Sequence, residues 1–116
     1  MALIRAIGGG GTNISNLADL TQEIGSITTP SGSFEATEDC ILIGTWGSST
    51  GTNAAIYLNQ ADNSHLLFGQ IANKTGLEIG NSSLGIGVVI TKGQKIYVRN
   101  ASGPQYNLHF YKIASS

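Results

Sequence analysis

The feature that most constrains this fold is a strand-like alternation of side chains in which both faces are apolar. It is clearest in CILIGTW, residues 40–46, where apolar residues occupy odd and even positions alike. Successive side chains of a strand point to opposite sides, and a strand that is apolar on both sides is typical of one buried on both sides. One face of the strand packs in the domain core, and the other face must be covered by further protein surface.

Further strand-like segments follow, joined by turn sequences. Residues 53–60 and 64–72 predict a hairpin around the polar turn ADN, and residues 85–90 and 95–100 predict a second hairpin around TKGQ. A last strand is predicted over 106–113. Sixteen glycines and only two prolines agree with short strands joined by tight turns.

About eight strands at this spacing predict an all-β fold, a two-sheet antiparallel jelly-roll sandwich. No internal repeat indicates a propeller or a solenoid. The predicted core takes apolar residues from one face of each strand: Leu42, Ile56, Leu58, Phe68, Val88, Ile96, Val98 and Phe110.

The N-terminal part has a different character. Four glycines at 8–11 form a hinge after a short apolar patch. Apolar residues in NISNLADLTQEIG predict either a short helix over 13–25, which Gly25 would end, or an extended arm lying over the body. We therefore divide the chain into an N-terminal arm with a glycine hinge, residues 1–26, and a jelly-roll domain, residues 27–116.

Charge and length exclude several classes of partner. The net charge is −1 and only 11% of residues are charged, which gives no field that would gather nucleic acid or an anionic membrane. The apolar patch before the glycines is too short for a signal-peptide core or for a bilayer-spanning helix. We expect neither nucleic-acid binding nor membrane insertion. We expect the chain to be synthesised in a cytoplasm without a signal peptide.

Reactive side chains are few and scattered. The chain has one cysteine, two histidines and seven acidic residues, and none of them has the spacing of a nucleophile with its base or of a metal cluster. Cys40 lies in an apolar run and is interpreted as a small buried hydrophobe. We predict that the protein is not an enzyme and that it has no catalytic residue and no cofactor.

The histidines leave one alternative open. His65 and His109 could each meet symmetry mates and hold an ion on a threefold axis, because imidazole is a common metal ligand. We favour ordinary exposed or hydrogen-bonded histidines. The acidic pair at 38–39 and the pair at 62–63 are interpreted as turns, so no metal site is predicted.

Aromatic residues supply the candidate ligand contacts. Tyr57 and Tyr97 lie beside polar side chains, and an amphipathic ring with such neighbours can stack on a sugar while amides hydrogen-bond to it. The candidate ligand-binding residues are therefore Tyr57, Asn59, Tyr97 and Arg99. The alternative is that the tyrosines cover the sandwich edge or a subunit seam. Trp46 is interpreted as a core residue.

Four stretches in fixed order carry a family resemblance: SFEATEDCILIGTW, AAIYLN, GVVITKGQKIYV and LHFYKI. Over about residues 32–114 the chain resembles the tumour-necrosis-factor-like jelly roll of complement-type globular heads and of small knobs on bacteriophage fibres. The matching residues are Phe34, Ala36, Val88, Val89, Ile90, Lys92, Gly93, Phe110 and Tyr111. Cys40 stands where the family often has glycine, and the calcium-binding carboxylates of some complement-type heads have no counterpart, so calcium is not expected.

The resemblance implies a homotrimer in which the sheet that holds the first buried strand and the last strand faces the threefold axis. We expect the contact residues to be those left over once the core faces are assigned: Ile41, Ile43, Val89, His109 and Tyr111. A monomer would expose them as one apolar patch, and closed cyclic assembly is a common way to cover such a surface.

The resemblance and the expected assembly together predict a virion structural protein, the homotrimeric knob of a phage or prophage fibre or tail tip. Its N-terminal arm is expected to dock on other virion proteins, and host-surface carbohydrate is its candidate ligand. Two alternatives remain, a capsid decoration protein of the same fold and a bacterial carbohydrate-binding or adhesion module.

Overall fold

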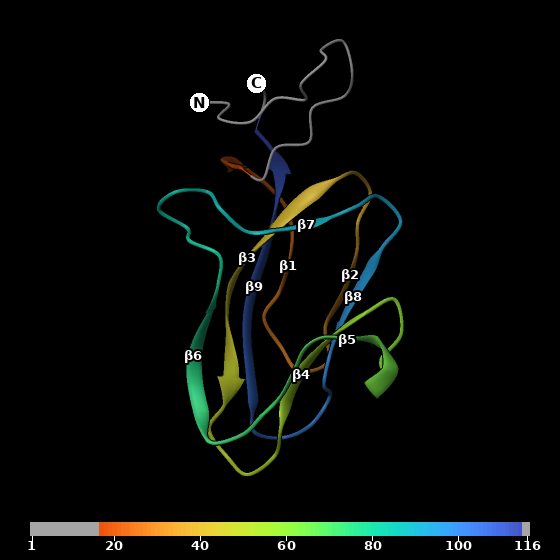
Figure 1. Cartoon of the computed structure of the whole chain (residues 1–116), viewed down its shortest axis with the longest axis vertical. Coiled ribbons are helices and arrows are strands. Elements are labelled where there is room, and N and C mark those ends of the chain that lie inside the picture. Colours follow the sequence, from red (N-terminus) through yellow and green to blue (C-terminus); the bar gives the residue numbers. More distant parts are fainter. Residues whose placement is uncertain (1–16, 115–116) are drawn as a thin grey trace.

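Strands dominate the computed structural model, which describes residues 17–114 (Figure 1). Within this part of the chain the one helical element is a single 3-10 turn, η1 (Asn63–His65). The all-β prediction is therefore confirmed. The strands are β1 (Ala18–Ile27), β2 (Ser33–Glu35), β3 (Cys40–Ser48), β4 (Ala54–Leu58), β5 (Leu66–Ile71), β6 (Lys74–Ile79), β7 (Val88–Ile90), β8 (Lys95–Val98) and β9 (Pro104–Ile113).

The strands form two antiparallel sheets that pack face to face. One sheet has the order β1-β9-β3-β6, and the other has the order β2-β8-β4-β5. Strand β7 belongs to the first sheet and pairs with residues 40–42 of β3, whereas β6 pairs with residues 44–48. Figure 1 shows the first sheet on one side of the molecule and the second on the other. The chain crosses between the sheets after β1, β2, β3, β5, β7 and β8. This is the two-sheet jelly roll that the sequence predicts.

The helix considered for residues 13–25 is wrong where the structure describes it. Ala18–Ile27 is the edge strand β1, which pairs with β9, and residues 13–16 lie outside the described residues. The register shifts between Ala18 and Glu23 and again between Glu23 and Gly25. The first shift sets five residue steps of β1 against two of β9, and the second sets two against one. The extra residues break the two-residue alternation, so the apolar spacing imitates a helix.

One predicted hairpin is confirmed and the other is wrong. Strands β4 and β5 pair directly. Strand β7 instead pairs with β3, while β8 pairs with β4 and β2 in the other sheet, so the turn between β7 and β8 crosses the sandwich. Ile86, which falls within the predicted first strand of this hairpin, lies with Leu84 in an exposed loop. Strand β6 was not predicted.

The core lies between the two sheets and confirms the residues chosen from the sequence. Five of them are buried, namely Leu42, Ile56, Ile96, Val98 and Phe110. The other three, Leu58, Phe68 and Val88, are partly buried and pack against the same cluster. Trp46 is also buried in this core, as predicted.

Candidate functional site

The outer face of the β1-β9-β3-β6 sheet brings the predicted trimer-contact residues together. Across β3 and β9, Ile41 lies opposite Tyr111 and Ile43 lies opposite His109. Val89 on β7 lies on the other side of Ile41. Paired residues of antiparallel strands share a face, and the neighbouring residues Leu42 and Phe110 point into the core. The five residues therefore form one surface.

That surface is less exposed in a single chain than the sequence predicts. Ile41 is fully buried and Ile43 is 4% exposed, so the expectation that a monomer exposes all five residues is wrong for these two. The cause is a close approach of the chain at Gly87, where an added Cβ would meet the carbonyl oxygen of Leu42 and the side chains of both isoleucines. Val89, His109 and Tyr111 remain half-buried.

His109 is held in place by its own chain. Its Nδ1 lies 3.0 Å from Oε2 of Glu23, and its Nε2 lies 2.9 Å from Oδ1 of Asn107. Both ring nitrogens thus have partners, which supports a hydrogen-bonded histidine rather than an axial metal ligand. Among residues 17–114 no cluster of three or more histidine, cysteine or acidic side chains could hold a metal ion.

The other candidate ion ligands lie in turns, as interpreted from the sequence. Asp62 accepts hydrogen bonds from His65 and Ser64, and these bonds hold the pKa of its carboxyl below the usual value. Oδ1 of Asp39 accepts the backbone N–H of Lys92 at 2.8 Å. These carboxylates stabilise turns.

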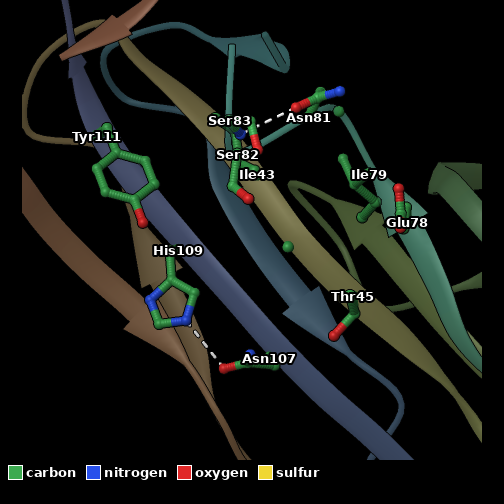
Figure 2. Close-up of a pocket in the computed structure, with 12 residues that line it drawn as sticks. Ile43, Thr45, Glu78, Ile79, Asn81, Ser82, Ser83, Asn107, His109 and Tyr111 are labelled. Carbon is green, nitrogen blue, oxygen red and sulfur yellow. Dashed lines mark hydrogen bonds between the residues drawn. The ribbon is translucent and has the colours of Figure 1, made fainter. Parts of the chain in front are cut away.

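The same outer face carries a cavity of about 420 Å³ between β9 and β6 (Figure 2). Ile43 and Thr45 from β3 lie along its middle, with His109 and Tyr111 from β9 on one side. The loop 80–83, which follows β6, forms the opposite wall. Figure 2 shows Asn107, His109 and Tyr111 in a row along β9, facing Ser82 and Ser83 across the hollow.

Sequence reasoning missed the polar residues of this cavity. Thr45 on β3 lies opposite Glu78 on β6 and opposite Asn107 on β9, so three polar residues form one row across the sheet. They are far apart in the sequence, and Glu78 belongs to β6, a strand that was not predicted. The available signal was the end of KTGLEI, where Glu78 stands between the apolar residues Leu77 and Ile79.

The predicted ligand contacts lie on the other sheet and do not form an open platform. Tyr57 and Tyr97 lie opposite each other on β4 and β8, but Tyr57 is only 6% exposed, so little of its ring is open to a ligand. Nζ of Lys95 lies 5.0 Å from the centre of the Tyr97 ring. Asn59 accepts the backbone N–H of Lys95 at 3.0 Å, and Arg99 is half-buried at the end of β8.

Cys40 is buried, as the sequence predicts. Burial, helped by the charges of Asp39 and Glu38, raises the pKa of its thiol from 9.0 to about 11. Burial also raises the pKa of the Tyr106 phenol and, with the charge of Glu23, that of Tyr111. A thiol held protonated in this way is a poor nucleophile.

We expect the free energy of unfolding to fall as the pH rises from about 9 to about 11. In this range the unfolded chain loses the Cys40 proton while the folded chain keeps it, and a folded state that binds more protons loses stability as the pH rises. Urea unfolding at several pH values measures the slope. Cys40→Ala should flatten it below pH 10, and equal slopes for the two proteins would contradict the assignment to this thiol.

Two further observations complete the description. Within residues 17–114 no helix has the length and apolar character needed to cross a membrane. Comparison with protein-family models, with curated proteins and with solved structures finds no match to this chain. The fold and the outer face of the β1-β9-β3-β6 sheet therefore carry the functional argument.

Proposed function

We propose that this chain is a non-enzymatic virion structural protein that assembles as a homotrimer and forms the knob of a phage or prophage fibre or tail tip. The observation that carries the proposal is the outer face of the β1-β9-β3-β6 sheet. There Val89, His109 and Tyr111 remain half-buried beside the fully covered Ile41. An aromatic ring and an aliphatic side chain left partly open on the outer face of a sheet favour contact with another protein surface.

The strand order supports the threefold form of this contact. The sheets β1-β9-β3-β6 and β2-β8-β4-β5 follow the jelly-roll arrangement of the family that the sequence resembles, and that family places the first of these sheets at the axis. The number of subunits rests on this resemblance. Association through the face is argued from the residues.

The non-enzymatic part of the proposal is supported by the state of the reactive groups. The Cys40 thiol is buried. Both nitrogens of His109 are engaged within the chain, and Nδ1 of His65 lies 2.7 Å from Asp62. These partners keep the reactive side chains in structural roles.

Light scattering on the purified protein tests the assembly. We expect a mass of about three times the 12.0 kDa of one chain. Tyr111→Asp should give monomers, because it would place an uncompensated charge in the contact. Tyr97→Asp is the matched control, since Tyr97 is also half-buried but lies on the other sheet, and it should leave the trimer intact.

A folded wild-type monomer at high concentration would contradict the trimer. If Tyr111→Asp fails to fold, as judged by circular dichroism, Val89→Lys on the same face provides the second test.

The place in the virion is tested separately by immunogold labelling of purified particles. Label on fibre or tail tips is expected, label on the capsid would favour a decoration protein, and label on the bacterial surface alone would favour an adhesion module.

A further inference from the structure

We propose that the cavity on the outer face of the β1-β9-β3-β6 sheet binds a neutral saccharide unit. Its volume of about 420 Å³ lies within the roughly 300–1,000 Å³ typical of small-molecule sites. None of the ligand contacts expected from the sequence lines it. The cavity is formed by a single chain, so its existence does not depend on assembly.

One side of the cavity offers a surface for the apolar face of a sugar ring. The rings of His109 and Tyr111 stand next to each other on β9, with centres 6.3 Å apart and planes 33° apart. Ile43 lies beside them on β3 but is only 4% exposed, so the two rings supply most of this surface. Aromatic and aliphatic surface with a few polar groups around it is the usual lining of a site for a small organic molecule.

The other side of the cavity offers unused hydrogen-bonding groups. Thr45 stands between Glu78 and Asn107 in one row across three strands. Within residues 17–114 no hydrogen bond or ion pair engages the side chains of Thr45, Glu78 or Ser82. An ionised carboxylate can accept from two neighbouring hydroxyls, and such charge-assisted bonds are the stronger kind.

The loop that carries Ser82 is held in shape before any ligand binds. Oδ1 of Asn81 accepts the backbone N–H groups of Ser83 and Leu84 at 2.9 and 3.2 Å. The backbone N–H of Asn81 donates to the carbonyl oxygen of Ile86 at 2.7 Å. A wall that is already ordered reduces the entropy that binding has to overcome.

Charge selects the class of ligand. Glu78 lines the cavity and Glu23 lies beside His109, so negative charge surrounds the site and disfavours an anion. His109 already binds Glu23 and Asn107 through its two nitrogens and offers no free donor. A neutral polyhydroxyl compound matches the hydroxyl, amide and carboxylate groups that remain.

This site adds a class of ligand to the proposed function. It rests on that function only for the source of the sugar, which is the host surface. Along β3, residues 40–42 pair with β7 and residues 44–48 pair with β6. The predicted trimer contacts Ile41 and Val89 lie at the β7 end, whereas Thr45 and Glu78 lie at the β6 end. Ile43, His109 and Tyr111 are also predicted trimer contacts and line the cavity, so a neighbouring subunit and the sugar share this part of the face. In a trimer the sugar reaches the site from the end formed by Thr45 and Glu78.

The test uses the full chain and methyl glycosides of mannose, galactose, glucose and N-acetylglucosamine, observed by saturation-transfer and amide-shift NMR. We expect at least one glycoside to bind with a dissociation constant on the order of millimolar. Amide shifts should concentrate at Thr45, Asn107 and the loop 80–83. Glu78→Gln should weaken binding by about tenfold, and Thr45→Val should weaken it less. Glu35→Gln, at an exposed position of β2 in the other sheet, should leave it unchanged.

Several results would overturn the site. Absence of binding by all four glycosides at about 50 mM would do so, as would binding that neither Glu78→Gln nor Thr45→Val weakens. Methylammonium that binds through Glu78 while the glycosides do not would identify an amine site instead. Light scattering on the same samples separates the two proposals, because a monomer that binds a glycoside at Glu78 supports the site and overturns the trimer. A trimer that binds none overturns the site alone.

Discussion

Replacing Phe110 with alanine is expected to lower the free energy of unfolding by about 3–5 kcal/mol. The Phe110 side chain is fully buried, and its ring stacks on that of Phe34 with centres 4.2 Å apart. The residue belongs to β9, the strand that pairs with both β1 and β3, opposite Gly25 and Leu42. Alanine would leave a cavity at the contact between the two sheets.

Packing around Phe110 gives this cavity little room to close. An added Cβ at Gly25 would overlap the ring of Phe34, so that ring already fills the space above β1. Urea unfolding monitored by circular dichroism measures the loss. Phe110→Leu is the matched control and should cost less, because it keeps more of the volume. A loss below about 1.5 kcal/mol for Phe110→Ala would show that the surroundings collapse into the cavity.

Replacing Tyr106 with phenylalanine is expected to lower the free energy of unfolding by about 1–3 kcal/mol, because it removes the partner of the buried backbone N–H of Ala55. The N–H of Arg99 and the carbonyl oxygen of Ala55 still bond to each other. The Tyr106 hydroxyl accepts the backbone N–H groups of Ala55 and Arg99 at 3.1 and 3.2 Å. It donates to the carbonyl oxygen of Ala55 at 3.0 Å. Tyr106 lies on β9 and Ala55 on β4, so this one oxygen joins the two sheets.

Tyr97→Phe is the matched control for this change. Tyr97 is half-exposed on the outer face of β8, and within residues 17–114 its hydroxyl makes no hydrogen bond. We expect its removal to change stability by less than about 0.5 kcal/mol. Equal unfolding midpoints for Tyr106→Phe and the wild type would contradict the role given to the Tyr106 hydroxyl.

The candidate site could be predicted only in part. Alternation along β3 and β9 placed Ile43, His109 and Tyr111 on a shared outer face, and the structure brings them together. The cavity beside them could not be predicted, because it depends on the pairing of β6 with β3 and on the course of the loop 80–83. Residues 45 and 78 become neighbours only through that pairing, and residues 45 and 107 through the pairing of β3 with β9.

The sequence by itself determined the fold class and much of the core. The alternation of side chains between two faces is a local property of an extended chain. Nearby side chains alone therefore predict strands such as β3, β4 and β9 and core residues such as Leu42 and Phe110. The absence of charge clusters and catalytic spacings is likewise a property of the sequence.

Only the tertiary structure decided where each strand pairs and which surfaces stay open. The bulges of β1 hide its alternation, and its assignment comes from hydrogen bonding to β9. The sequence around the turn after β7 is typical of a hairpin, yet β7 pairs with β3 and β8 pairs with β4 in the other sheet. Tyr57 alternates like an outward residue but is covered by its neighbours. Contacts between distant segments decide which strands pair and which side chains are buried. These contacts override the local conformational preference of a segment, because strand propensity mostly reflects such packing.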